Sequence, residues 1–253
     1  MTAPQFDDLT DIFESMVNWP KRLAHEDPFY RQLFAQVGVT SVVDVACGTG
    51  HHAAMFHSWD SVRRVEGADI SPAMIARAKA ALGEPEGLRW VVRPYEQPIE
   101  TEIPFDAAVC VGNSLALAAD EATARKALGC MVAAVRPGGV IVVQVLNIWS
   151  LPDGPIVWQK SVRANLPDGP ALVIKGVHRA GRSAFVELLA GTLEGEAKMR
   201  SACVHVLGLE QADLEDALRA GGADQIAVLG GYAGQPYDRA ASVDLILVAR
   251  RAT

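Results

Sequence analysis

Strand-like and helix-like patterns of apolar residues alternate along the first part of the chain. Apolar runs of strand length predict strands at 41–46, 62–68, 88–92, 105–111 and 139–146. Helices are predicted between them at 51–58, at 71–82 with Ser71-Pro72 at its start and Gly83 after its end, and at 120–135 from Asp120 to before Pro137. Such alternation is typical of an α/β fold with a doubly wound parallel sheet, which binds ligands at the carboxyl ends of its strands.

A helical segment precedes this alternation. Apolar residues at helical spacing predict a first helix, and they are Leu9, Ile12, Phe13, Met16 and Val17. A second helix is predicted to begin at Asp27 as N-cap, with Pro28 in its first turn, and to end before Gly38. Residues 1–38 are therefore expected to form a helical lid over the domain.

The pattern changes after residue 150. Strand-like segments at 156–164, 171–178, 182–193 and 197–207 are separated by turn signals at 167–170 and 180–182. They predict a small inserted antiparallel sheet within 151–208. A helix from Glu210 to Gly221 and strands at 224–230 and 242–250 follow, so that 209–253 completes a single domain.

The segment from Asp44 to Gly50 carries the clearest chemistry. It ends an apolar run and enters a glycine turn, Asp44-Val-Ala-Cys-Gly48-Thr-Gly50, in front of a predicted helix. Residues 48–53 also satisfy G-x-G-x-x-A, a fingerprint of dinucleotide-binding domains, and this leaves an NAD-binding oxidoreductase as an alternative. A carboxylate in the turn repels a pyrophosphate, however, and suits the ammonium of an amino acid. Asp44 therefore favours a sulfonium amino acid as the ligand.

This turn resembles the first motif of the class I S-adenosylmethionine-dependent methyltransferases, in the form found in glycine and sarcosine N-methyltransferases and related small-molecule enzymes. Later segments also resemble the family, in the expected order: 65–74 with Asp69, 105–115, 135–143, and 230–249 as a closing hairpin. The resemblance implies a seven-stranded, mostly parallel sheet and S-adenosyl-L-methionine as cofactor. It also implies that residues 39–150 form the cofactor-binding half and that the inserted sheet within 151–208 lies on the substrate side. Asp69 follows the second strand, where a carboxylate accepts both ribose hydroxyls.

The resemblance also implies a set of cofactor-binding residues, some of them with a plainer alternative. Met74 is a candidate for ribose or adenine contact or for the core, and Arg22 for the cofactor carboxylate or for the solvated surface. At the third motif Pro94 stands where relatives carry an acidic residue, so the backbone N–H groups of Tyr95 and Glu96 are the adenine candidates, an ordinary loop being the alternative. The full set is Arg22, Asp44, Ala46, Gly48, Gly50, Asp69, Ile70, Met74, Tyr95, Glu96, Cys110 and Asn113.

The acceptor is expected to be a small molecule. Gly112-Asn113-Ser114-Leu115 lacks the Asn/Asp-Pro-Pro-aromatic sequence of enzymes that methylate nucleic-acid bases, and Asn113 is alternatively a turn former. Leu146 replaces an arginine by which relatives hold an amino-acid carboxylate, which disfavours glycine itself. Candidate acceptor-side residues are Asn147, Trp149, His178, Tyr232 and Tyr237.

The sequence offers no convincing catalytic base. His51 and His52 are assigned to capping or solvent, and His178, His205 and Glu187 are weak candidates. This favours nitrogen as the methyl acceptor, with oxygen, carbon or a non-catalytic cofactor-binding protein as alternatives.

Composition excludes several other classes. The 253 residues carry a formal net charge of −7, which argues against nonspecific binding to nucleic acid. No leader-like segment and no long apolar run occurs, so a cytoplasmic protein without membrane association is expected. Cys47, Cys110, Cys130 and Cys203 form no C-x-x-C pair and are expected to be reduced and buried, and no metal site is expected.

Overall fold

The computed structural model describes residues 10–253; Leu9 and the side chain of Phe13, both assigned to the predicted lid helix, lie outside the described part. The helices are α2 (Thr10–Met16), α3 (Trp19–Val37), α4 (His51–His57), α5 (Pro72–Leu82), α6 (Glu121–Ala134) and α7 (Gln211–Ala220), with short 3-10 turns η1 (Leu115–Leu117) and η2 (Ile148–Ser150). The strands are β1 (Ser41–Val45), β2 (Arg64–Asp69), β3 (Leu88–Val92), β4 (Phe105–Cys110), β5 (Val135–Leu146), β6 (Val157–Leu166), β7 (Gly169–Ala180), β8 (Ser183–Thr192), β9 (Met199–Leu207), β10 (Ala223–Leu229) and β11 (Asp244–Arg251).

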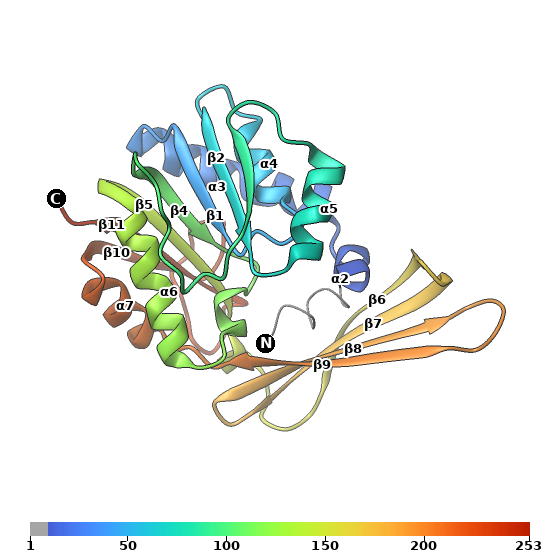
Figure 1. The fold of residues 1–253 in the computed structure, drawn as a ribbon. Helices are drawn as coiled ribbons and strands as arrows, with labels where there is room; N and C mark the ends of the chain where they lie inside the picture. The colour runs from blue at the N-terminus through green and yellow to red at the C-terminus, as the bar shows by residue number, and fades with distance from the viewer. Residues whose placement is uncertain (1–9) are drawn as a thin grey trace.

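A seven-stranded sheet in the order β10-β11-β5-β4-β1-β2-β3 forms the centre of the molecule (Figure 1). The five strands from β3 to β5 run parallel, and only β11 of this sheet runs antiparallel to its two neighbours, β5 and β10. All five residues of β1 are buried, because helices cover both faces of the sheet. Val43 packs in the core that includes α6 and α7, whereas its neighbour Val42 packs in the core that includes α3, α4 and α5. The predicted α/β fold with a mostly parallel seven-stranded sheet is confirmed.

The start of β4 is fastened by Asp106. Its Oδ2 accepts hydrogen bonds from the backbone N–H and hydroxyl groups of Thr40 and Ser41, at 2.9 to 3.0 Å, and its Oδ1 pairs with Arg136 Nε at 2.5 Å. Although burial opposes the charge, the bonds from Arg136, Thr40 and Ser41 lower the pKa of Asp106 to about 2. One carboxylate thus joins the starts of β1 and β4 to the start of β5.

We expect Asp106→Asn to lower the free energy of unfolding by about 2 kcal/mol at pH 7, because an amide accepts fewer of these bonds and cannot pair with Arg136. A carboxyl with a lowered native pKa stabilises the fold above its unfolded pKa and loses that contribution as the pH falls toward its native pKa. Urea unfolding from pH 7 to pH 3 should therefore show the two proteins converging below about pH 4. A difference that stays constant over this range would contradict the assignment.

Helix α3 begins at Trp19, so the prediction of a start at Asp27 is wrong. Asn18 is the N-cap, and its side chain accepts a hydrogen bond from Lys21 N at 3.1 Å. Pro28 lies inside the helix and removes one main-chain hydrogen bond there. The buried side chains that follow Pro28 keep the helix continuous to the left-handed cap at Gly38, which was predicted as its end.

A second, antiparallel sheet of order β6-β7-β8-β9 extends away from the seven-stranded sheet (Figure 1). One end of its inner face joins the main core through Val177 and Val206. The other end packs against Ile12 and Met16 of α2. Helix α2 therefore lies on this sheet, and a hollow remains between the two contact regions.

Two further properties concern the surface. No helix among residues 10–253 is both long and apolar enough to cross a membrane. Cys203 is exposed and Cys130 is half-buried, so the prediction of four buried cysteines is wrong for these two. Cys203 alternates with inward-facing Val204 on β9, which turns it toward solvent.

Candidate active site

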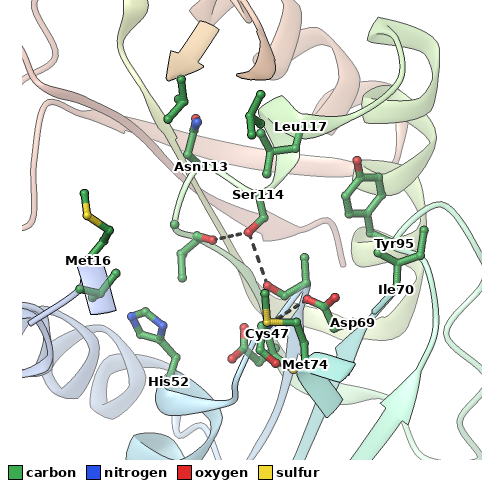
Figure 2. Close-up of a pocket in the computed structure, with 18 of the residues that line it drawn as sticks. Met16, Cys47, His52, Asp69, Ile70, Met74, Tyr95, Asn113, Ser114 and Leu117 are labelled. Carbon is green, nitrogen blue, oxygen red and sulfur yellow. Dashed lines mark hydrogen bonds between the residues drawn. The ribbon is translucent and has the colours of Figure 1, made fainter. Parts of the chain in front are cut away.

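A cavity of about 660 Å³ opens where the carboxyl ends of β1, β2 and β4 face the inner surface of the second sheet. This size falls in the range of small-molecule and cofactor sites. Figure 2 shows the residues labelled around it: Met16, Cys47, His52, Asp69, Ile70, Met74, Tyr95, Asn113, Ser114 and Leu117. The α2–α3 turn closes one side with Met16 to Trp19.

The glycine turn after β1 forms the floor of this cavity. Gly48 has a φ of +57°, and a Cβ added there would meet no atom within 4 Å, so the backbone is open to the cavity. Ala46 also has a positive φ of 58°, a conformation that costs a residue with a Cβ about 1–2 kcal/mol. The turn is therefore held in a shape that lets a ligand approach the main chain closely.

Asp44 is a buried carboxylate beneath the turn. Its side chain is 1% exposed and lines the cavity, and its Oδ2 has no hydrogen-bond partner among the described residues. Burial and the nearby charge of Asp69 raise the pKa of Asp44 to about 8. Because a buried acceptor without a partner is costly, this atom fits a ligand that supplies a cationic N–H donor.

Asp69 lies at the end of β2 on the same side. Its Oδ2 accepts from Gly48 N at 2.8 Å and its Oδ1 from Ser71 N at 2.9 Å. These bonds fix the carboxylate against the glycine turn and the start of α5. Ile70 and Met74 line the cavity next to it (Figure 2).

The remaining predicted residues that reach the cavity come from four separate segments. Ala46, Tyr95, Glu96, Asn113 and Arg22 all line it. Asn113, with a φ of 69°, accepts a hydrogen bond from Leu146 N at 2.9 Å, so it holds the end of β4 against β5. Arg22 pairs with Glu26 at 2.8 Å, and the pair keeps the guanidinium against the cavity wall.

Gly50 and Cys110 do not line the cavity, and for both the reason is packing. A Cβ at Gly50 would lie 2.3 Å from the Trp90 ring, so this glycine makes room for a core side chain. Cys110 is fully buried in the core that includes α6. The sequence analysis assigned both residues to cofactor binding because they stand in or beside the motifs of the family.

None of the five predicted acceptor-side residues lines the cavity. Asn147 is 1% exposed, and its amide group binds Arg239 O, Ser242 O and the Tyr237 hydroxyl. Trp149 stacks with the Arg239 guanidinium, whose Cζ lies 4.3 Å from its ring centroid.

Tyr232 and His178 lie elsewhere. Tyr232 packs in an aromatic cluster with Phe29 and Tyr30, at centroid distances of 5.4 and 5.9 Å. His178 alternates with Val177 on β7, which turns it to the outer face of the second sheet, where it stacks on Phe185. The same outer face carries Glu187 and His205, which were weak candidate bases.

His52 is a cavity residue that the sequence analysis assigned to capping or solvent. It is 5% exposed, lines the cavity and binds Glu26 through Nε2 at 2.6 Å. Burial lowers the pKa of His52, which favours the neutral ring at neutral pH. Sequence spacing alone gave no sign of this contact, because Glu26 belongs to α3, whose start was mispredicted.

Glu14 of α2 fastens the lid to the glycine turn. Glu14 Oε1 accepts two hydrogen bonds, one from Thr49 Oγ1 and one from Trp19 Nε1 at 3.2 Å. His51 Nε2 lies 3.2 Å from Glu14 Oε2. Although burial opposes the charge, the hydrogen bonds from His51 and Thr49 lower the pKa of Glu14. The contact links the lid to the residue next to Gly48.

We expect Glu14→Gln to weaken binding of a ligand in the cavity by roughly 10-fold, because the lid loses a charged hydrogen-bond partner. Calorimetric titration with S-adenosylhomocysteine measures this effect. Glu121→Gln, which removes an exposed carboxylate on α6, is the matched control and should bind as the unmodified protein does. Equal affinities for all three proteins would show that the contact does not support the site.

Comparison with known proteins agrees with this geometry. Residues 42–139, which contain the glycine turn and Asp69, match the model of a methyltransferase domain family. This part of the chain belongs to a methyltransferase domain family. The resemblance stated from the sequence is thereby confirmed, together with the cofactor that it implies for the domain.

Several known methyltransferases are similar to this protein. The glycine/sarcosine N-methyltransferase of Parasynechococcus marenigrum (strain WH8102) is 33% identical over 156 residues, which cover 58% of this chain and 52% of that protein. The match thus spans about half the length of that relative.

Solved structures match over more of the chain. The amino pentose methyltransferase CalS10 from Micromonospora echinaspora, determined with S-adenosylmethionine bound, has a TM-score of 0.71 at 25% identity over 93% of this chain and 92% of that one. The sugar N-methyltransferase KedS8 from Streptoalloteichus sp ATCC 53650 has a TM-score of 0.73 at 25% identity over 91% and 88%.

Proposed function

We propose that the protein transfers the methyl group of S-adenosylmethionine to a nitrogen atom of a small molecule. The observation that carries this proposal is the Asp44 carboxylate, buried beneath the glycine turn with one oxygen lacking a partner among residues 10–253. The amino group of the methionine moiety fits it. Relatives and structural neighbours whose names specify N-methylation of glycine, sarcosine or sugars support nitrogen as the acceptor atom.

Four residues are assigned to cofactor binding. Asp44 receives the ammonium group, Gly48 lets the main chain approach the amino-acid portion, and Asp69 receives the ribose hydroxyls. Arg22, held by Glu26 at the cavity wall, is assigned to the cofactor carboxylate. Tyr95 and Glu96 flank the position of adenine, whereas Gly50 and Cys110 support the site from the core.

The bound cofactor would supply an electrophilic methyl group, and the chain's part is to align the acceptor and exclude water. The α2–α3 turn closes one side of the cavity and so limits the access of water to it. A strong base is not required when the acceptor amine arrives unprotonated. His52, neutral and inside the cavity, is the residue best placed to accept a proton, and its Glu26 partner orients the ring.

Calorimetric titration with S-adenosylmethionine, S-adenosylhomocysteine and NADH tests the proposal. Binding of the first two without NADH supports it, and an amine panel followed by mass spectrometry for a gain of one methyl group then identifies the acceptor. Binding of NADH alone would instead identify an oxidoreductase. Methylation at oxygen or carbon, or binding without turnover on any amine, would overturn the assignment of N-methyl transfer.

A further inference from the structure

Two lysines stand side by side among apolar residues on the inner face of the second sheet. Lys160 on β6 and Lys175 on β7 are direct partners in the antiparallel register. Both line the cavity, together with the apolar side chains of Val186, Leu188 and Val204 from the next two strands. The wall that faces the strand ends of the main sheet therefore carries two ammonium groups in an apolar surround.

This arrangement is unfavourable for the protein alone. Like charges that are directly opposite in neighbouring strands destabilise a sheet. Lys160 donates to the carbonyl oxygen of Met16 at the end of α2. Lys175 is half-buried, and its ammonium group has no hydrogen-bond or ion-pair partner within residues 10–253. Burial, followed by the charges of Lys160 and Arg22, lowers its pKa.

Two aspartates and two lysines line different walls of the cavity. Asp44 and Asp69 lie at the strand ends, where the cofactor is assigned, and Lys160 and Lys175 lie on the second sheet. A ligand between these walls meets carboxylates on one side and ammonium groups on the other. An anionic group beside Lys175 would offset the repulsion from Lys160 and Arg22 and favour the charged form of the lysine.

We propose that Lys175, assisted by Lys160, binds an anionic group of the methyl acceptor, which is then a small amphipathic molecule with a carboxylate or a phosphate-type group. This inference rests on the proposed function, since it places the acceptor opposite the cofactor. The inserted sheet then binds the anionic group. Leu146, which replaces the arginine that holds a carboxylate in relatives, cannot fill this role. The flanking valines and leucine contact the apolar part of the same molecule.

The test uses three probes that differ only in their head group. The protein saturated with S-adenosylhomocysteine is titrated with heptanoate, hexylphosphonate and hexan-1-ol, which all carry a hexyl chain. We expect both anions to bind at least about 10-fold more tightly than the alcohol, as one charged hydrogen bond provides. The stronger of the two anions identifies the head group as carboxylate or phosphate-like.

Variants connect the preference to the lysine. Lys175→Met keeps the length of the side chain and should remove the preference for anions while leaving hexan-1-ol binding unchanged. Lys175→Arg should restore part of it. Lys198→Met, which removes an exposed lysine beyond the end of β8, is the matched control and should retain the full preference. The thermal midpoint and S-adenosylhomocysteine affinity of each variant verify that it is folded.

The outcomes separate the two proposals. Failure of the unmodified protein to bind S-adenosylhomocysteine would refute the proposed function. Binding of S-adenosylhomocysteine without any preference for the anions, or with no binding of the three probes, would overturn only the present inference. A preference that survives Lys175→Met would overturn it as well.

Discussion

The Asp44→Asn variant is expected to bind S-adenosylmethionine about 100-fold more weakly than the unmodified protein. The amide has nearly the shape of the carboxyl but cannot carry the charge that meets the ligand's ammonium group, and a charged hydrogen bond is worth about 2–3 kcal/mol. Calorimetry at pH 8 measures the loss. Asp168→Asn, which removes one exposed charge from the turn between β6 and β7, is the control and should bind normally.

The same variant should become more stable relative to the unmodified protein as the pH rises. The pKa of Asp44 in the ligand-free fold is about 8, above its ordinary value of 3.8. Between these values the native state holds a proton that the unfolded state has released, so the unmodified protein loses stability with increasing pH, by up to about 1.4 kcal/mol per unit from this residue. Asp44→Asn lacks this slope, and urea unfolding between pH 5 and pH 8 should show the difference growing.

Ligand binding provides an independent check of the same carboxyl. An ammonium group beside Asp44 favours the charged form, so binding at pH 7 should release a proton from it. Calorimetry in buffers with different enthalpies of ionisation detects that proton, and Asp44→Asn should abolish its release. Unchanged affinity and unchanged proton release in the variant would show that the ligand's ammonium group binds elsewhere.

The same substitution at two glycines of one turn should mainly weaken ligand binding at one position and mainly lower stability at the other. Gly48→Ala is expected to fold with a penalty of about 1–2 kcal/mol for its positive φ, but to bind S-adenosylmethionine roughly 10-fold or more weakly, because its methyl group enters the cavity. Gly50→Ala is expected to lose about 3–5 kcal/mol of stability, since its Cβ would meet the Trp90 ring at 2.3 Å in addition to a φ of +86°.

A second substitution distinguishes a steric clash from a general effect of the turn. Trp90→Phe removes the ring atoms that the new Cβ would meet, so Gly50→Ala combined with Trp90→Phe should be more stable than the sum of the two single changes predicts. Thermal and urea unfolding give the four free energies. Strict additivity would mean that Trp90 is not the obstacle.

The sequence was sufficient where the chemistry is contiguous. Asp44, Gly48 and Asp69 stand at the ends of continuous apolar strands, so their strand-end location follows from chain order alone. Helix α3 was mispredicted because Asp27-Pro28 has the composition of a helix start, while packing carries the helix through it. Asn147 looked like a site residue because it is polar and follows a buried strand, but distant main-chain carbonyls satisfy it.

The acceptor wall could not be found from the sequence because it depends on strand register. A register shift between Trp158 and Lys160 decides which side chains of β6 face inward. A one-residue change of register would turn Lys160 to solvent, and no local pattern reveals where such a shift occurs. His178 was chosen for its chemistry, although the alternation of β7 places Lys175 inside and His178 outside.

Helix α2 contacts both walls of the cavity. Ile12 and Met16 pack on the second sheet, while Glu14 binds Thr49 beside Gly48. A ligand that contacts one wall and holds α2 in place therefore also keeps the other wall in the position that binds its ligand. Because binding free energies are linked, the factor by which the cofactor tightens acceptor binding is the factor by which the acceptor tightens cofactor binding. We therefore expect the lid to make the occupancies of the two halves positively cooperative, and the demethylated cofactor to be held less firmly once the product has left.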